Sequence, residues 1–557
     1  MLQIFALFAV FLAPVLSDSS HFPGSSHFSP SHGNSLWNGW GGGILNNRWA
    51  SSNTQVNSAS IKSLSANCKH VYDSGVSATP TVGEDGIVYY PTWEGRLVAL
   101  DYTTCKVKWE INVTEIILNF GPQLSTNTFV PAVARTSPQI SNGVLYFGTL
   151  LNCLMVAVKL EDGSVLDTFQ LNSNQYAIVT MSPTLYNGHL FIGASSMEET
   201  AADRIPNYKC CTFTGNVMAL TFDGSKFHAA WNISMIPDDE VAMGWTGNAI
   251  WGSQPAIDVK RNQVFFATGN VYSVPDVITK CQQQTANITA ISTGLVPESC
   301  LPSDVWQEAV LAIDIDDGLV NWVRQLSPLD SWTVACGIPG RLPKIPEVCT
   351  GVPGPDADFG MAPAYVPGNA NTPFGRDIVV VGQKNGNLHA LNAQTGSLFW
   401  SVATSPDGTG GGLSWGVAAD DTRAYFTAIN ANLKPYHLIP SNQSVHTSAF
   451  GAASLTDGRI EWETVVPFGQ AAYVPPTVVG DIVIAGRTGL DQGHGVLANT
   501  TGGLIVMNKA TGEILQDMEL DANFHGGIAV QGDYLMFGTG YSGLNTTGTF
   551  VVAKIGK

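Results

Sequence analysis

The chain has 557 residues, of which 44% are hydrophobic and 13% charged, and its formal net charge is −18. Its 44 acidic and 26 basic residues leave no surplus of Lys and Arg to neutralise phosphates, so the composition excludes a nucleic-acid partner. The 58 Gly and 30 Pro favour many short strands and tight turns over long helices.

The N-terminus predicts export from the cell. Residues 1–17 are an apolar run that is too short to span a bilayer and ends at small residues, as a signal peptide does. A membrane anchor is the alternative, because no basic residues precede the run. Residues 18–34 form a flexible Ser-, His-, Gly- and Pro-rich leader, which is expected to contain His21, His27 and His32. Six N-glycosylation sequons fit a secreted, extracellular protein, at Asn112, Asn232, Asn287, Asn442, Asn499 and Asn545.

Nine cysteines in an exported chain predict disulfides. Two local pairs are expected, since each encloses a loop with Pro and Gly that needs a covalent staple: Cys281 with Cys300, and Cys336 with Cys349. Cys68 is paired with Cys105 as a guess, which leaves Cys153 unpaired. The neighbours Cys210 and Cys211 bond either to each other or to different partners.

From Ser77 onward a unit of four short strands recurs. The first strand carries a small residue and Pro, as in SATPTV, and the second is aromatic or β-branched and ends in Gly, as in GVLYFGTL. The third resembles GRLVALD, and an Asp-Gly or Thr-Gly turn leads to the fourth. Eight units begin near Ser77, Arg135, Thr180, Trp251, Phe359, Ser414, Tyr473 and Phe524. Five fourth strands carry a Trp that is expected to pack between units: Trp109, Trp231, Trp322, Trp400 and Trp462.

These units predict an all-β fold, an eight-bladed β-propeller of four-stranded antiparallel blades over residues 35–557. The last unit stops at the C-terminus without a fourth strand. Residues 59–73 can supply that strand, which would close the ring in a blade shared by both ends and leave no open sheet edge.

Blades of this kind present two sets of loops on one face, those between blades and those between second and third strands. Loops on a rigid scaffold commonly carry function. This rule places Arg135, Trp251 and Asp330 on the same face as Glu198, Cys210, Cys211, Asn270 and Lys384. Such a set predicts a site for a cation and an anionic ligand.

Several segments resemble the quinoprotein dehydrogenases that use pyrroloquinoline quinone (PQQ), most closely their polyvinyl-alcohol-dehydrogenase-like branch. The resemblance runs from about Trp37 to the end and rests on segments that include WNGWGGGILNNRW, GASSMEET, KCCTFTGNVMAL, AIWGSQPAID, FATGNVYS, PGPDADFGMAP, GQKNGNLHALNAQTG and GGGLSWGVAADD. It implies an eight-bladed propeller, in agreement with the strand count.

The resemblance also implies cofactors and their ligands. Glu198 and Asn270 match the positions that hold a Ca²⁺ ion beside the quinone, and hard oxygen ligands suit Ca²⁺. Trp251 matches the ring that lies beneath the quinone, and Arg135 and Lys384 match the cations that face its carboxylates and its quinone oxygens. Each residue also has a purely structural interpretation. Glu198 would be a solvated acid, Asn270 a turn residue and Trp251 part of the core. Arg135 and Lys384 would be surface charges.

A bonded Cys210–Cys211 pair covers the cofactor in quinoprotein alcohol dehydrogenases. There it precedes the Arg that matches Arg135, whereas in this chain the pair lies in the third blade, as in the polyvinyl-alcohol branch. Whether it still covers a ligand is left open.

The chain differs from the family at the position of the catalytic base. The related enzymes place an Asp directly after a Trp following blade four, but this chain reads LSPLDSWTVACG, with Thr333 at that position. Asp330, two residues before Trp332, is the substitute candidate. The chain also lacks the Cys-X-X-Cys-His haem-attachment motif, so a dehydrogenase would need an external electron acceptor.

Two functions compete. The first is a secreted oxidoreductase that uses PQQ and Ca²⁺ to oxidise a small or polymeric alcohol, with Asp330 as the base. The second is a catalytically inactive extracellular propeller that binds matrix components. A hydrolase lacks support, because no convincing Ser, His and Asp constellation is present. Neither reading involves a membrane or nucleic acid.

Overall fold

The computed structural model describes residues 36–285, 300–338, 340–349, 352–492, 498, 500–541 and 547–556. The predicted signal peptide and leader lie outside these residues, as do the sequons Asn287, Asn499 and Asn545. No helix in the described ranges has the length and apolarity needed to cross a membrane.

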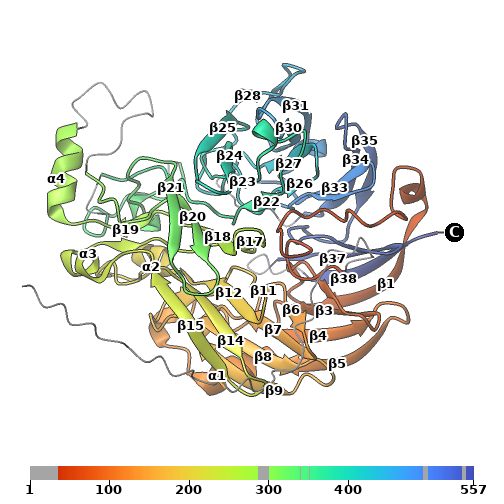
Figure 1. Ribbon diagram of the computed structural model, residues 1–557, viewed down its shortest axis with the longest axis horizontal. Coiled ribbons are helices and arrows are strands. Elements are labelled where there is room, and N and C mark those ends of the chain that lie inside the picture. The colour runs from red at the N-terminus through yellow and green to blue at the C-terminus, as the bar shows by residue number, and fades with distance from the viewer. Residues whose placement is uncertain are drawn as a thin grey trace, which may run out of the picture.

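Eight antiparallel four-stranded sheets are arranged around a central axis, so the predicted eight-bladed propeller is confirmed (Figure 1). In chain order the first four blades are β2 (Thr81–Val82), β3 (Ile87–Pro91), β4 (Arg96–Asp101) and β5 (Lys106–Asn112); β6 (Gln139–Ser141), β7 (Val144–Gly148), β8 (Leu154–Lys159) and β9 (Val165–Gln170); β11 (Thr184–Tyr186), β12 (His189–Gly193), β14 (Asn216–Phe222) and β15 (Phe227–Ser234); β17 (Ala256–Asp258), β18 (Gln263–Ala267), β20 (Ala309–Asp314) and β21 (Val320–Gln325).

The other four blades are β22 (Ala364–Val366), β23 (Ile378–Gly382), β24 (Asn387–Asn392) and β25 (Leu398–Ala403); β26 (Ala418–Ala419), β27 (Arg423–Ala428), β30 (Ala449–Ser454) and β31 (Ile460–Val465); β32 (Thr477–Val479), β33 (Ile482–Arg487), β34 (Gly503–Asn508) and β35 (Ile514–Glu519); β36 (Ala529–Gln531), β37 (Tyr534–Gly538), β38 (Gly548–Ile555) and β1 (Leu64–Tyr72).

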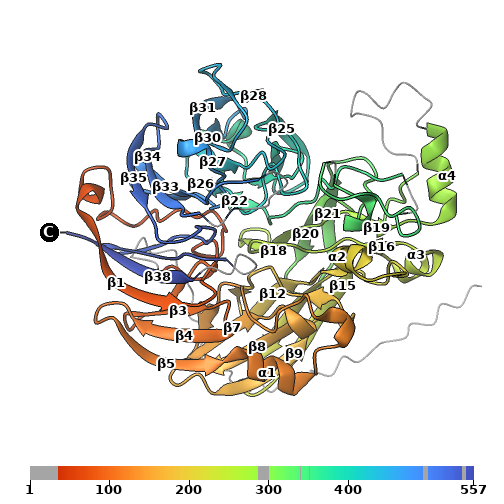
Figure 2. The ribbon, with the colours of Figure 1, turned by 180° about the vertical axis from the view of Figure 1, so that it is seen from behind.

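Smaller elements occupy the connections. The short strand pairs are β10 (Ala177–Ile178) with β13 (Ser195–Ser196), β16 (Thr246–Gly247) with β19 (Val271–Ser273), and β28 (Tyr436–His437) with β29 (Ser444–Val445). The α-helices are α1 (Val113–Phe120), α2 (Glu198–Arg204), α3 (Asp238–Met243) and α4 (Asp276–Thr285), and α4 stands at the rim (Figure 2). Single 3₁₀ turns are η1 (Ser60–Ser63), η2 (Ser125–Asn127), η3 (Leu151–Cys153), η5 (Val334–Cys336), η6 (Pro373–Gly375) and η7 (Pro467–Gly469).

The predicted closure of the ring is confirmed. Strand β1 pairs antiparallel with β38 from Leu64 opposite Ile555 to Tyr72 opposite Gly548, so the last blade contains strands from both ends of the chain. In Figure 1 the red β1 lies beside the blue β38. This pairing removes the open edge that β38 would otherwise present to another chain.

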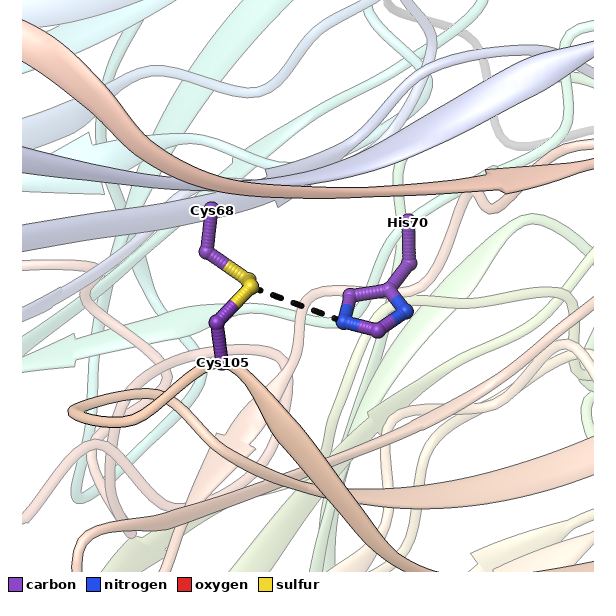
Figure 3. Close-up of side chains that lie close together, drawn as sticks. All are labelled: Cys68, His70 and Cys105. Atoms are coloured by element: carbon purple, nitrogen blue, oxygen red, sulfur yellow. Dashed lines mark hydrogen bonds between the residues drawn. A yellow bond between two sulfur atoms is a disulfide. The ribbon is translucent and has the colours of Figure 1, made fainter.

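A disulfide fastens the same closure. Cys68 in β1 is bonded to Cys105 in the turn between β4 and β5, which links the last blade to the first (Figure 3). The ring nitrogen Nε2 of His70 lies 3.7 Å from the sulfur of Cys105. Both thiols are used in the disulfide, so this cysteine and histidine group is a covalent staple and not a metal site.

The other cysteine expectations are confirmed as well. Cys281 is bonded to Cys300 and Cys336 to Cys349, and the adjacent Cys210 and Cys211 are bonded to each other. Cys153 is the free, buried cysteine.

The fourth-strand Trp residues pack between blades as expected. The indole Nε1 of Trp109 donates to the carbonyl of Leu160 at 3.0 Å, and a Cβ on Gly163 would lie 2.9 Å from that ring. The equivalent bonds run from Trp231 to Ile315, Trp322 to Ala393, Trp400 to Leu455 and Trp462 to Lys509. Each Trp therefore joins its blade to the next, and the Gly of the following turn has a positive φ and leaves room for the ring.

The segment 36–50 is hydrogen-bonded to several blades. Backbone N–H groups of blades 4, 5, 6 and 7 donate to its carbonyls, at Ile257, Tyr365, Ala419 and Val478. Its buried Arg48 donates to the carbonyl of Pro476 at 2.9 Å and also to that of Trp40. Because Trp40 lines the cavity described below, this segment contributes to its lining.

Candidate functional site

A cavity of about 760 Å³ lies where the loops between blades meet the loops between second and third strands. Three of the predicted site residues line it: Arg135 before β6, Trp251 before β17 and Lys384 between β23 and β24. Glu199, Trp332, Asp356, Trp415, Tyr473, His525 and Tyr541 also line it. The volume falls within the range of about 300–1,000 Å³ typical of small-molecule sites.

Lys384 is held between two buried carboxylates. Its Nζ lies 2.8 Å from Oδ1 of Asp356 and 2.7 Å from Oδ2 of Asp358. Burial alone would lower the pKa of Lys384, but the two carboxylates raise it above its usual value. The cavity therefore contains a fixed positive charge beside the carboxylate of Asp356.

The two adjacent acids at the start of α2 differ in what surrounds them. Both oxygens of Glu198 accept hydrogen bonds, from the backbone N–H of Thr212 at 2.8 and 3.0 Å and from that of Phe213 at 2.7 Å. The hydroxyls of Tyr208 and Thr212 donate to Oε1 as well. Glu198 thus anchors the loop that carries the disulfide between residues 210 and 211.

Glu199, in contrast, lines the cavity, and its Oε2 is buried without a hydrogen-bond partner among the described residues. Burial raises the pKa of Glu199 to about 8, although the charge of Lys384 opposes the shift. Its carboxylate is therefore available to a ligand in a way that the carboxylate of Glu198 is not.

Asn270 has one open atom. Its Nδ2 donates to the carbonyls of Val271 at 2.9 Å and Trp332 at 2.8 Å, and its backbone N–H donates to Oδ1 of Asp358 at 2.6 Å. These bonds fix the amide so that Oδ1 is buried without a partner within the described ranges. A buried polar oxygen of this kind gains free energy when a ligand or ion supplies the partner.

Asp330 is buried and is not among the described residues that line the cavity. It is 1% exposed, and its Oδ2 accepts the backbone N–H of Ala357 at 2.7 Å. Burial raises its pKa, and burial together with the charge of Asp330 raises the pKa of neighbouring Glu308 well above its usual value. In the described structure Trp332 lines the cavity, but the carboxyl groups of Asp330 and Glu308 do not.

In the described part of the chain, Cys210 and Cys211 also lie outside the cavity lining. Cys211 packs partly buried against the core of blades 2 to 4. The structure thus brings Arg135, Trp251 and Lys384 into one cavity, while the other five predicted site residues are not among the described residues that line it.

The residues that sequence reasoning missed are Glu199, Asp356 and Asp358. All three lie in segments that had marked the family, SSMEET and PGPDADFG. The sequence signal that could have identified them is a pair of nearby acids in each segment. Only the fold shows which acid of each pair faces the cavity.

The opposite wall is aromatic. Nη1 of Arg135 lies 3.5 Å from the hydroxyl of Tyr541, and its guanidinium carbon lies 5.2 Å from the centre of the Trp415 ring. His525 lies between Tyr473 and Tyr541, with ring centres 5.0 and 4.3 Å away. Arg135 therefore bridges the aromatic wall and the polar part of the cavity.

Comparison with known proteins places the chain among PQQ-type propellers. The profile of the PQQ_2 family, described as outer membrane protein assembly factor BamB, matches residues 26–324 and 307–491. Polyvinylalcohol dehydrogenases from Pseudomonas sp and Sphingopyxis sp. (strain 113P3) are each 26% identical over 400 residues, or 70% of this chain. The match covers 54% of the length of those two relatives.

Solved structures show the same fold. A quinohemoprotein alcohol dehydrogenase from Pseudomonas putida HK5 has a TM-score of 0.66 at 16% identity, over 94% of this chain and 80% of that one. A europium-containing methanol dehydrogenase has a TM-score of 0.65 at 15% identity, over 94% of this chain and 98% of that one. At such identities the likeness concerns the fold alone.

Proposed function

The chain belongs to the PQQ_2 family of propellers, in the polyvinyl-alcohol-dehydrogenase-like branch, and we propose on that premise that it is a secreted oxidoreductase that oxidises an alcohol with PQQ and Ca²⁺. One observation carries the proposal: the cavity contains Trp251, the ion pair of Lys384 and Asp356, and the open carboxylate of Glu199. These are an aromatic face, a fixed cation and an oxygen ligand, which together suit a planar anionic cofactor with a bound metal ion.

The residues present fit PQQ. The half-buried Trp251 offers a flat ring whose Nε1 has no partner in the described part of the chain. Arg135 and Lys384 supply positive charge for the carboxylates and quinone oxygens of the cofactor. When bound, PQQ would accept the hydride of the alcohol as a two-electron oxidant. Lys384 would stabilise the negative charge that develops on reduction.

The residues also fit a Ca²⁺ ion. Glu199 and Asn270 each have a buried oxygen that lacks a partner among the described residues, and Ca²⁺ prefers carboxylate and amide oxygens. We therefore assign the metal to Glu199 and Asn270 in place of Glu198, whose oxygens are already bound by five protein donor contacts.

Asp356 is the residue proposed to take the hydroxyl proton. It lines the cavity, in contrast to Asp330, and burial raises the pKa of its carboxyl above the usual value while Lys384 opposes the shift. A raised pKa makes the carboxylate a better proton acceptor. Lys384 holds this oxygen in place at 2.8 Å, so the same cation orients the base and faces the cofactor.

Electrons would leave through a separate acceptor, and the reaction would take place outside the cell. The four disulfides fit an oxidising compartment. Cys210–Cys211 would affect the cofactor indirectly, through the loop that Glu198 anchors.

A titration tests the function. PQQ is added to the purified chain with and without Ca²⁺, and quenching of Trp fluorescence and alcohol-dependent reduction of a dye are recorded. Saturable, Ca²⁺-dependent quenching together with dye reduction supports the enzyme. Absence of both with every alcohol would leave an inactive extracellular binding propeller as the better description.

A further inference from the structure

Four rings form the cavity wall contributed by the connections before blades 6, 7 and 8 and within blade 8. These rings, Trp415, Tyr473, His525 and Tyr541, are called the aromatic wall. The planes of Tyr473 and Tyr541 lie within 15° and 12° of the imidazole plane, and the Trp415 ring is nearly perpendicular to it, with ring centres 4.5 Å apart. His525 is therefore held by stacked rings, and a ligand can reach its ring nitrogens only along its edge.

Among the described residues, that edge has no hydrogen-bond partner. His525 is 5% exposed, and neither of its ring nitrogens makes a hydrogen bond to any described residue. The same holds for Nε1 of Trp415 and Oγ of Ser414, which line the cavity nearby. A buried polar group without a partner is unfavourable, so a ligand with several oxygens would supply the missing hydrogen bonds.

The chemistry of the imidazole selects among such ligands. Burial, with the charge of Arg135, lowers the pKa of His525 to about 3, so the ring is neutral near pH 7. A neutral imidazole offers one donor and one acceptor. A hydroxyl group matches both, because it accepts from the N–H or donates to the other nitrogen. A carboxylate only accepts, so it could bind the N–H but would leave the other ring nitrogen without a donor.

The aromatic wall lies opposite Trp251 and meets the proposed cofactor site at Arg135, which contacts Trp415 and Tyr541. In a ring of eight blades the eighth lies opposite the fourth, so His525, before β36, faces Trp251, before β17, across the channel. A cavity of about 760 Å³ lies in the upper part of the range for single drug-sized ligands. This volume is more than twice the lower bound of about 300 Å³ for a small-molecule site, which leaves space for a second molecule beside a tricyclic cofactor.

We propose that the aromatic wall is a substrate subsite in which His525 binds a second hydroxyl group, so that the protein prefers cyclic polyols to alcohols with one hydroxyl. The C–H face of such a ring would pack on Trp415 and Tyr541, and Trp415 Nε1 and Ser414 Oγ would bind further hydroxyls. This inference rests on the proposed function for the reaction itself, but binding alone can be tested without it.

The test compares His525→Phe with the wild type. Phe keeps a ring between Tyr473 and Tyr541 and removes both nitrogens. His437→Phe is the control, since His437 is exposed and lies outside the cavity lining. Methyl glucoside, cyclohexanol and PQQ are each titrated calorimetrically into the cofactor-free protein, and the two alcohols also into protein loaded with PQQ and Ca²⁺. Thermal melting confirms that both variants fold.

The expected result is a loss of about tenfold in affinity for methyl glucoside in His525→Phe, with cyclohexanol and PQQ unchanged and His437→Phe like the wild type. Equal binding of methyl glucoside and cyclohexanol by the wild type would overturn the proposal. So would an unchanged glucoside affinity in His525→Phe, or a loss confined to PQQ, which would make His525 a cofactor ligand. If PQQ fails to bind anywhere, the proposed function fails while the cofactor-free titration still decides the subsite.

Discussion

Glu198 and Glu199 are neighbours at the start of α2, yet the carboxylate of one is fully bound by protein donors and that of the other is open to the cavity. A helix turns by about 100° between successive residues, so adjacent side chains cannot face the same way. Glu198 is buried away from the cavity and anchors the loop before β14, whereas Glu199 lines the cavity and is left for a ligand.

This difference predicts opposite results for two matched variants. Glu199→Gln should weaken PQQ binding in Ca²⁺ at least tenfold and abolish its dependence on Ca²⁺, with little change in melting temperature. Glu198→Gln should lower the unfolding free energy by roughly 2–3 kcal/mol, because its new NH₂ group must face a backbone N–H donor. Fluorescence titration and thermal melting measure the two effects. If Glu198→Gln alone lost Ca²⁺ dependence, the metal ligand would be Glu198.

The cation between Asp356 and Asp358 gives a second prediction. Lys384→Met removes the only charge that compensates two buried carboxylates at this point in the described structure, and should destabilise the fold by roughly 3–5 kcal/mol. Denaturant unfolding measures the loss.

Lys434→Met is the control, because Lys434 pairs with Asp407 while both side chains are 47% exposed. An exposed pair contributes about 0–1 kcal/mol. Similar losses in the two variants would mean that Lys384 contributes no more than a surface charge.

A buried acid in the sixth blade predicts how stability depends on pH. Glu463 in β31 is 8% exposed, its Oε2 accepts the N–H of Ile439 at 2.7 Å, and the hydroxyl-bearing ring of Tyr436 lies nearby. Burial raises the pKa of Glu463 from 4.5 to about 7. Its contribution to stability is therefore complete below pH 4.5 and is lost as the pH rises through 7, by about 3 kcal/mol in total.

Glu463→Gln should remove this dependence. The variant should melt at a higher temperature than the wild type at pH 8 and at nearly the same temperature at pH 4.5, since the neutral amide resembles the protonated acid. Melting curves from pH 4.5 to 8 test the effect. Parallel curves for the two proteins would show that Glu463 ionises at its ordinary pKa in the fold.

The repeated strands made the fold predictable, because each blade repeats one local pattern. Each recurring feature has a local physical cause: the Pro of the first strand, the Gly that ends the second and the Trp of the fourth. The contact of Trp109 with Gly163 is an example, because a Cβ on that Gly would collide with the ring. The missing last strand even predicted the pairing of β1 with β38.

The candidate site was less accessible to sequence reasoning. Arg135, Trp251 and Lys384 were placed in the cavity by a rule about loops, which fixes the face of the propeller. The rule does not fix the direction of a side chain within a loop, and so it could not separate Glu198 from Glu199 or identify Asp356. His525 gave no signal, because its partners Tyr473 and Tyr541 come from distant connections.

The seam between the first and last blades gives the final prediction. The Cys68–Cys105 disulfide spans 37 residues and joins β1 to the β4–β5 turn, so replacing both cysteines with Ser should lower the unfolding free energy by about 2–4 kcal/mol. Because β1 is held otherwise by its ladder with β38, amide hydrogen exchange should accelerate first in β1 and β38 while blade 4 stays protected. Uniform acceleration across all blades would mean that the ring opens as one cooperative unit, and that the disulfide stabilises the whole propeller and not its seam.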